Sequence, residues 1–213
     1  LGLCLATDAQ AQTAKWVFTN SAPTVIPEVG PAFPYPSTLA VSGVTGMTYH
    51  LSVTLRLSHP SPQDLDIVLL APSGLAVMLL SDTGSGAVGG WSDTVLTFDD
   101  CAPRTLQYGV VPAGRYRPTN NGAGDALGSP APSGTYSHAL AEFNWRSPNG
   151  TWQLFAMDDL NVNAGAIESW SMTIFTQPKP WSVAPGSGIN PASCMAPDYD
   201  GDGRTDVAVY RPQ

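Results

Sequence analysis

Proline and glycine interrupt this chain so often that long helices are excluded. They account for 20 and 21 of the 213 residues, and both residue types end or weaken helices. Apolar residues still make up 43% of the chain, enough for a buried core, whereas charged residues are only 12%, too few for a coiled coil. This composition favours one β-rich domain accompanied by short additional segments.

Short alternations of apolar and polar residues predict strands between these breaks. In the clearest one, residues 48–57, one face carries Tyr49, Leu51, Val53, Leu55 and Leu57. Further strands are predicted at 39–44, 64–70, 76–80, 94–98, 151–157 and 170–175. Many short strands without a helical period favour an all-β sandwich of the jelly-roll type. Residues 12–22 are polar, and we expect them to be flexible.

The acidic residues are almost all aspartate, and they occur in clusters. There are 14 Asp against three Glu, the net charge is −8, and no basic stripe offers a site for nucleic acid. Neighbouring carboxylates repel one another unless a cation lies between them, and such hard oxygen ligands suit calcium. Within the predicted sandwich the candidate calcium ligands are Asp64, Asp66, Asp99, Asp100, Asp158 and Asp159.

These candidates, together with Asp82, fall at strand ends or in turns. Several of them are therefore expected to converge on one edge of the sandwich around calcium. The alternative for any one pair is that its carboxylates cap a turn.

The strongest local motif is an acidic loop near the C-terminal end of the sequence. Its ligands to calcium would be the carboxylates of Asp198, Asp200, Asp202 and Asp206 and the backbone carbonyl of Arg204. An apolar strand pattern follows instead of a helix, so the loop is not an EF-hand. Residues 198–213 resemble the start of an FG-GAP/VCBS-type repeat, which implies a calcium loop leading into a strand.

Two segments outside the sandwich indicate secretion and a linker. Residues 1–11 are short, apolar and end in a small-x-small pattern, which predicts the tail of a secretory signal peptide. Residues 178–197 are a Pro/Gly/Ser linker. Removal of the signal would leave Cys101 and Cys194, which either form a disulfide in an oxidising compartment or stay two thiols. No stretch of the sequence is long enough to span a membrane.

An ordered series of motifs in residues 16–177 carries a family resemblance. It starts with Tyr35-Pro36-Ser37-Thr38 and continues with His59, Asp64-Leu65, Pro72 and Gly74, then Ser81-Asp82, Leu96-Thr97-Phe98-Asp99-Asp100, Asn149-Gly150-Thr151-Trp152, Asp158-Asp159, Gly165 and Trp170-Ser171. In this order the set resembles the P domain (Homo B domain) of subtilisin-like proprotein convertases, in its bacterial form. Cys101 departs from the family pattern, where a small residue usually follows the two aspartates.

The resemblance implies a jelly-roll sandwich that accompanies a secreted protease and has no catalytic residue of its own. It also implies packing on neighbouring domains of a longer protein, such as a subtilisin-like catalytic domain, and dependence on calcium. Consistent with this, none of His50, His59 and His138 lies in a subtilisin-like motif, and no nucleophilic serine segment occurs. The buried faces are expected to include Leu65, Ile67 and Leu69 with Trp152, Leu154 and Ala156.

Two other functions stay open at the level of sequence. A surface or carbohydrate-binding module would need exposed aromatic rings for stacking, for which the candidates are Trp91, Tyr116, Tyr136 and Trp145. An aspartic protease would need a second carboxylate beside the Asp82-Thr-Gly sequence. Asp93 is the candidate for that second carboxylate, although it lacks the following glycine.

Overall fold

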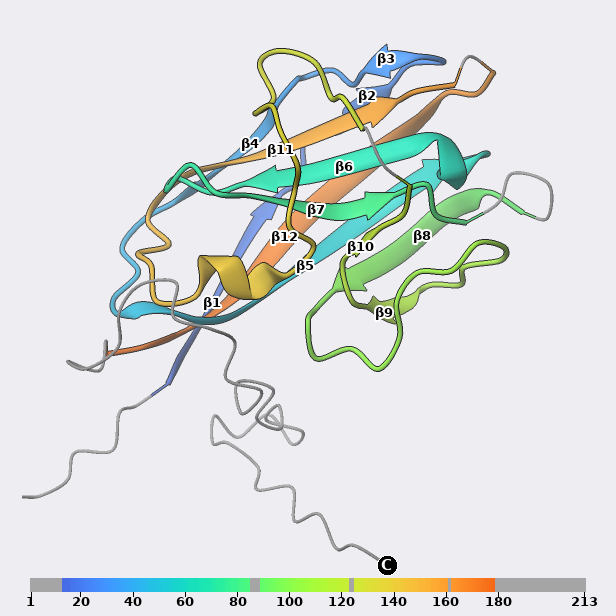
Figure 1. Cartoon of the computed structure of the whole chain (residues 1–213). Helices are drawn as coiled ribbons and strands as arrows, with labels where there is room; N and C mark the ends of the chain where they lie inside the picture. The colour runs from blue at the N-terminus through green and yellow to red at the C-terminus, as the bar shows by residue number, and fades with distance from the viewer. Residues whose placement is uncertain (1–12, 85–88, 123–124, 161, 179–213) are drawn as a thin grey trace, which may run out of the picture.

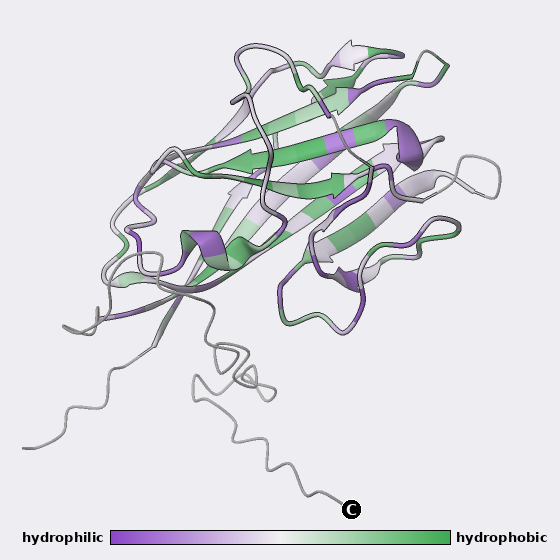
Figure 2. Ribbon diagram, viewed as in Figure 1, coloured by the Kyte–Doolittle hydropathy of each residue, from purple (hydrophilic) through white to green (hydrophobic). Residues whose placement is uncertain are grey.

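Two six-stranded sheets packed face to face form the body of the protein (Figure 1). The computed structural model describes residues 13–84, 89–122, 125–160 and 162–178. The predicted all-β sandwich is confirmed. Apolar residues run along the strands of both sheets, whereas polar residues gather in the connections (Figure 2).

The first sheet, sheet A, has the strand order β1-β12-β5-β8-β9, with β2 also paired to β12. Its strands are β1 (Ala14–Asn20), β2 (Thr24–Ile26), β5 (Met47–His59), β8 (Trp91–Phe98), β9 (Gly114–Tyr116) and β12 (Gly165–Gln177). The two longest strands, β5 and β12, pair antiparallel along the middle of this sheet.

The second sheet, sheet B, has the order β10-β7-β6-β11-β3, with β4 also paired to β11. Its strands are β3 (Gly30–Pro31), β4 (Ser37–Val41), β6 (Leu65–Leu70), β7 (Ala76–Ser81), β10 (Thr119–Asn120) and β11 (Gly150–Asp158). Two short 3-10 helices, η1 (Pro62–Asp64) and η2 (Leu140–Phe143), complete the described elements.

The core between the sheets contains the side chains that were predicted to be buried from the alternation of apolar and polar residues. Leu65, Ile67 and Leu69 of β6 lie in it with Trp152, Leu154 and Ala156 of β11, as predicted. Trp152 is 1% exposed, donates from Nε1 to the Pro148 carbonyl at 2.8 Å and meets the Phe143 ring edge-on.

Two local expectations were wrong, and strand pairing explains both. Residues 14–20 form β1, which pairs with β12 over its whole length, and Trp16 and Phe18 of this strand pack on the core. Tyr49 leaves the buried face of β5, because a register shift opposite Phe175 and Thr176 leaves Tyr49 out of the pairing.

The outer face of sheet B is covered by a second, smaller core. Val68, Met78 and Phe155 point away from the main core and pack with Leu127 from the long connection after β10. Part of the loop-rich region 101–136 therefore covers the sheet, so β6 is buried on both faces. Burial of β6 on both faces also limits the access of water to the aspartate side chains at the start of this strand.

Several predictions concern residues outside the described part of the chain. They are the signal tail at 1–11, nearly all of the linker at 178–197 and the calcium loop at 198–213 with Asp198, Asp200, Asp202, Arg204 and Asp206. Cys4 and Cys194 also lie outside the described residues. All of these stay predictions.

Replacing Trp152 by alanine should destabilise the sandwich strongly. Removing a fully buried Trp costs about 3–5 kcal/mol, since the surrounding side chains fill the cavity only in part. The matched control is Val17→Ala, because Val17 is 58% exposed and its loss should cost less than about 0.5 kcal/mol. Urea unfolding of both variants tests this, and similar midpoints for the two would contradict the packing described.

Candidate metal centre

Antiparallel pairing brings most of the predicted acidic residues to one end of sheet B. Strand β6 runs opposite to both β7 and β11, so its first residues lie beside the last residues of its neighbours. This end, on the right in Figure 1, is called the acidic end below. Its carboxylates belong to Asp64, Asp66, Asp82, Asp125 and Asp159.

The Ser81 hydroxyl lies at the centre of the acidic end. Its Oγ is 3.3 Å from Asp82 Oδ2, 3.0 Å from Asp125 Oδ2 and 3.1 Å from the Asn121 carbonyl oxygen. It also hydrogen-bonds to the Asp66 carboxyl group. A hydroxyl donates only one proton, so four acceptor groups surround a single donor. Such a cluster of oxygens favours either an extra proton or a cation.

Burial and mutual repulsion raise the pKa values of three carboxyl groups of the acidic end, those of Asp66, Asp82 and Asp159. The pKa of Asp66 is raised to about 7, first by burial and then by the charge of Asp125, with further contributions from Asp159 and Asp82. The pKa values of Asp82 and Asp159 are raised as well, again first by burial and then by neighbouring aspartates. The acidic end is thus electrostatically strained when all its carboxylates are ionised.

Within the described residues, no basic side chain forms an ion pair with this group of aspartates. Among the described residues the ion pairs of carboxylates are His50–Asp99, Arg56–Asp93, His59–Asp158 and Arg115–Asp99, none of which involves the acidic end. Asp64 is 3% exposed, and its Oδ2 atom is buried without a hydrogen-bond partner. An unpaired buried carboxylate oxygen is costly, so Asp64 indicates a missing positive partner.

At the acidic end, the backbone at Gly122 comes very close to the Asp82 side chain. Asp82 has φ of 49°, in the left-handed region that only a minority of non-glycine residues adopt. Gly122, with φ of 76°, passes so near that a Cβ atom there would lie 2.6 Å from Asp82 Oδ2. Asp159 is exposed, and Asp82 and Asp125 are half-buried, so the site opens to solvent on one side.

Asp158, although next to Asp159, has a different role. It is fully buried, and its Oδ2 lies 2.9 Å from Nε2 of the fully buried His59. Burial raises its pKa, while the Leu160 amide and His59 oppose this effect. Gly165 leaves room for the ring, since a Cβ there would lie 2.5 Å from His59 Cδ2. His59 is therefore a buried structural residue, and Asp158 is its ion-pair partner.

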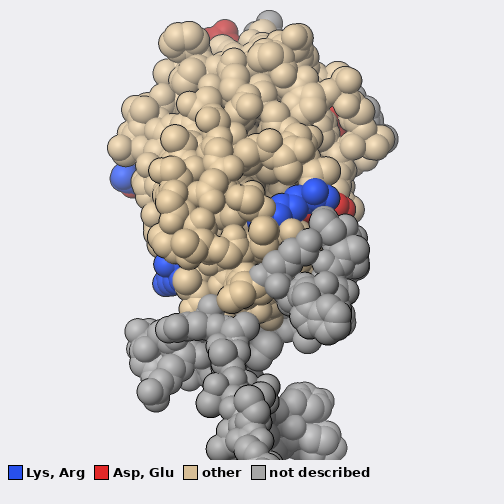
Figure 3. Space-filling model, turned by 90° about the vertical axis from the view of Figure 1, so that its left-hand side faces the viewer, with Lys and Arg blue, Asp and Glu red and all other residues tan. Residues whose placement is uncertain are grey.

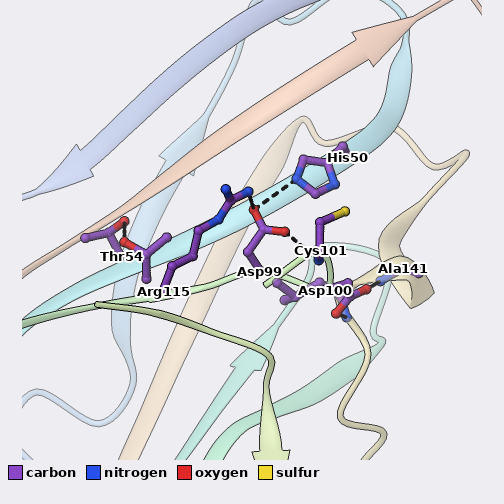
Figure 4. A network of polar contacts seen from close by, with 9 residues as sticks. His50, Thr54, Asp99, Asp100, Cys101, Arg115 and Ala141 are labelled. Atoms are coloured by element: carbon purple, nitrogen blue, oxygen red, sulfur yellow. Dashed lines mark hydrogen bonds and ion pairs between the residues drawn. The ribbon is translucent and has the colours of Figure 1, made fainter. Parts of the chain in front are cut away.

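Asp99 lies in a separate polar network between β5, β8 and β9 (Figure 4). It accepts hydrogen bonds from His50 at 3.1 Å, from Arg115 at 2.5 Å and from the Cys101 amide at 2.8 Å. Burial by itself would raise the pKa of Asp99, but His50, Arg115 and the Cys101 amide lower it below the ordinary value. The carboxylate is thus fully provided with protein partners.

Asp100 caps the start of η2. Its two oxygens accept hydrogen bonds from the Leu140 amide at 2.9 Å and the Ala141 amide at 2.7 Å. Burial raises its pKa, and these two bonds oppose that rise. For each aspartate pair, the alternative to calcium binding was that the carboxylates cap a turn. Asp100 has a capping role of this kind. We leave both Asp99 and Asp100 out of the metal centre proposed below.

One other group of metal-ligating atoms is compact. Ligand atoms of His50, Asp99 and Cys101 lie within 4.8 Å of one another, the single such group in the described ranges. Cys101 is disulfide-bonded, however, so its sulfur is not a thiolate ligand. No three carboxylates of the acidic end have ligand atoms within 4.8 Å of one another, so they would have to close around an ion by side-chain rotation.

Sequence reasoning found only part of this arrangement. It named Asp64, Asp66, Asp158 and Asp159 as candidate ligands and Asp82 as a further aspartate expected to converge with them, and the structure brings these to one end of sheet B. It did not select Asp125 or Ser81. Asp125 follows the Asn-Gly-rich stretch 120–124, a turn signal that can place a carboxylate over a sheet end. Ser81 belongs to the Ser81-Asp82 motif of the family resemblance, but nothing in that motif indicates a ligand role for its hydroxyl.

The structure gives little support to the two alternative functions, a stacking platform of aromatic rings and an aspartic protease. Trp91 and Tyr116, two of the four candidate stacking rings, are each 4% exposed, and Tyr136 and Trp145 are half-buried. Asp93 binds Arg56 on the exposed side of β5 and β8 and does not supply the second carboxylate that an aspartic protease needs. The opposite end of the sandwich from the acidic end is mostly uncharged, with a few basic and a few acidic side chains (Figure 3).

Comparison with known proteins gives a partial family match. A family model described as the proprotein convertase P-domain matches residues 48–98, the stretch from β5 to β8. This stretch contains Asp64, Asp66 and Asp82 of the acidic end. The match covers less than half of the chain. No curated protein matches the chain.

Two solved structures of the serine protease of Aeromonas sobria are similar to the fold. The protease in complex with its chaperone has a TM-score of 0.47 at 16% identity, over 78% of this chain and 27% of that one. The other structure of the protease has a TM-score of 0.46 at 16% identity, over 80% and 28%. The chain thus spans little more than a quarter of the length of these proteases. In its described part, no helix is long and apolar enough to cross a membrane.

The raised pKa of Asp66 predicts how the free energy of unfolding depends on pH. A carboxyl group whose folded-state pKa lies above its unfolded value binds more protons in the folded state, so stability falls as pH rises through that window. In metal-free buffer, unfolding free energy should therefore decrease between pH 4 and about 7. The contribution of Asp66 has an upper limit of roughly 4 kcal/mol, at about 1.4 kcal/mol per pH unit.

The measurement is urea unfolding of the wild type and Asp66→Asn at pH 5 and pH 8. The difference between the two pH values should shrink in Asp66→Asn and persist in Asp93→Asn, whose exposed carboxylate is paired with Arg56. An equal pH dependence in wild type and Asp66→Asn would show that Asp66 ionises normally.

Proposed function

We propose that this chain is a non-catalytic, calcium-stabilised module of the P-domain kind, from a secreted protein that carries further domains. Its role is to stabilise or position an associated domain, for which a subtilisin-like serine protease is the best candidate. The observation that carries the calcium part is the acidic end of sheet B, where the carboxylates of Asp66, Asp82 and Asp125 surround Ser81. None of its five aspartates has an ion pair within the described residues, and Asp64 Oδ2 is buried without a hydrogen-bond partner.

The donor set of the acidic end suits calcium better than a transition metal. It consists of carboxylate, hydroxyl and backbone carbonyl oxygens, with no imidazole or thiolate among the groups that face Ser81. Calcium takes six to eight oxygen ligands in flexible geometry, which tolerates contributions from four different connections. Asp66, Asp82, Asp125, Asp64 and Asp159 would hold the ion, and Ser81 and the Asn121 carbonyl are further oxygen donors.

Two further observations support the proposed secretion and the proposed partner domain. The match of residues 48–98 to the P-domain family supports a protease-associated role. Extracellular calcium modules bind with dissociation constants of about 10⁻⁴–10⁻³ M, which fits a secreted protein and the predicted signal tail at 1–11. A second calcium loop at 198–206 stays a separate proposal that depends on the sequence motif alone.

Calcium should raise the melting temperature of the full chain. At a dissociation constant of about 10⁻⁴ M, 10 mM calcium is about 100-fold in excess and adds about 2.7 kcal/mol. For a domain of this size, that is roughly 5–10 °C. The measurement is thermal unfolding by circular dichroism in 10 mM calcium chloride and in EGTA, at pH 7.5.

The variant Asp82→Asn plus Asp125→Asn should lose most of this rise, because both side chains face Ser81. The matched control is Asp93→Asn, which removes a carboxylate from sheet A and should keep the full rise. A wild type that does not respond to calcium would contradict the proposed function. A rise that the double variant keeps in full would place the ion elsewhere in the chain.

A further inference from the structure

We propose that reduction of the Cys101 disulfide opens a zinc site formed by His50, Asp99 and Cys101. These residues supply an imidazole, a carboxylate and, after reduction, a thiolate, a ligand set that suits zinc rather than calcium. They come from β5 and from the connection after β8, so the site is separate from the acidic end and does not depend on the proposed calcium function.

The ligand atoms of the three residues are close to the spacing that zinc needs. They all lie within 4.8 Å of one another, and His50 Nε2 is 3.1 Å from Asp99 Oδ2. Zinc binds nitrogen and oxygen at about 2.0–2.2 Å and sulfur at about 2.3 Å, so neighbouring ligands of a tetrahedral ion are about 3.3–3.8 Å apart. The nitrogen and the oxygen thus nearly fit, and the sulfur has to move by roughly 1 Å at most.

The turn after β8 orients the carboxylate before any ion binds. The Cys101 amide donates to Asp99 Oδ1 at 2.8 Å, whereas Oδ2 faces His50 Nε2. The Ala102 amide donates to the Asp99 carbonyl at 2.9 Å, and the Asp99 amide donates to the Tyr116 carbonyl at 2.8 Å. Figure 4 shows the Cys101 sulfur next to the His50 ring. Backbone bonds of this kind fix a ligand in the orientation that a metal requires.

The surroundings of Cys101 favour reduction of its disulfide. An imidazole beside a sulfur stabilises the thiolate, and the Arg115 ion pair neutralises the charge of the neighbouring Asp99. Cys101 is half-buried, and the His50 side chain is 18% exposed, so a small reductant has access from solvent. A disulfide that is accessible and has a stabilised thiolate as its leaving group is reduced more readily than an enclosed one.

The reductant is a dithiol, and the exchange proceeds in two steps. One thiolate of the dithiol attacks the sulfur of the cysteine bonded to Cys101, and Cys101 leaves as a thiolate. The second thiol of the dithiol then breaks the mixed disulfide and releases that cysteine. Two electrons pass to the protein, and the dithiol becomes a disulfide. When zinc binds, the Cys101 thiolate carries no proton, and the His50 imidazole carries its proton on Nδ1.

Arg115 takes the place of the cation while the disulfide is intact. Its Nη2 is 2.5 Å from Asp99 Oδ2, the same oxygen that zinc would bind. The Arg115 side chain is 43% exposed, so it can turn toward solvent when the ion arrives. Removal of the Arg115 charge should therefore strengthen zinc binding, whereas removal of a ligand should weaken it.

The test uses the full chain with Cys4→Ser and Cys194→Ser, which leaves Cys101 as its only cysteine. Cobalt is the probe, because Co²⁺ bound to a thiolate absorbs strongly in the near ultraviolet. Excess calcium chloride occupies sites made only of oxygen. One cobalt ion per chain should give the thiolate band, and zinc should displace it. The wild type should lack the band while its disulfide is intact and gain it after reduction and oxygen-free desalting.

Substitutions in the single-cysteine chain distinguish ligands from neighbours. His50→Gln should weaken cobalt binding by about tenfold or more, and Cys101→Ser should abolish the thiolate band. Arg115→Gln should strengthen binding several-fold. The matched control is His138→Gln, because His138 is exposed and lies outside the group, and it should bind cobalt like the parent. Circular dichroism checks that each variant is folded.

Four results would overturn the inference. They are the absence of the band in the single-cysteine chain, a band in the wild type with its disulfide intact, unchanged binding with His50→Gln, and weaker binding with folded Arg115→Gln. The calcium-dependent rise in melting temperature, measured on the same proteins, tests the proposed function separately. A zinc site without that rise, or the rise without a zinc site, shows which of the two proposals has failed.

Discussion

The antiparallel pairing of β6 with β7 and β11 is the constraint on which the rest of the structure depends. It places a strand that is buried on both faces in the middle of sheet B. The same pairing brings the start of β6 to the ends of β7 and β11. Because aspartates stand at all three of these positions, the pairing that builds the core also builds a concentration of negative charge. The hydrophobic core must therefore stabilise an end of the sheet that is electrostatically unfavourable by itself.

This conflict connects stability to function. The acidic end is unlike the other acidic positions of the molecule, where the structure supplies partners. Asp99 has His50 and Arg115, Asp158 has His59, and Asp100 has two backbone amides. In the part of the chain that the structure describes, the carboxylates around Ser81 have no ion pair, and the proposed calcium ion would supply the missing positive charge. A module of this kind would be most stable where calcium is abundant, and it could then support a neighbouring domain in the same compartment.

Sequence reasoning predicted the fold well because alternation and turn residues carry most of the information in a sandwich. It identified the inward faces of β6 and β11, and the aspartates at one end of sheet B. It failed where tertiary contacts decide the outcome. Residues 12–22 were expected to be flexible, yet residues 14–20 form β1, because a full-length partner, β12, is available. It also treated Asp99 and Asp100 like the other pairs, since the partners of these two come from His50, Arg115 and η2, which are distant in the sequence. Asp125 was missed for the same reason: only the fold brings its loop to Ser81.

The most direct test of a cation site at the acidic end is an anomalous diffraction map from crystals of the protein soaked in a lanthanide chloride. The account predicts anomalous density among the carboxylates of Asp66, Asp82 and Asp125, with metal–oxygen distances of about 2.3–2.6 Å as for calcium. It also predicts that Asp99 and Asp158 keep their protein partners, without density beside them. Density beside Asp99 or Asp100 and none at the acidic end would contradict the account.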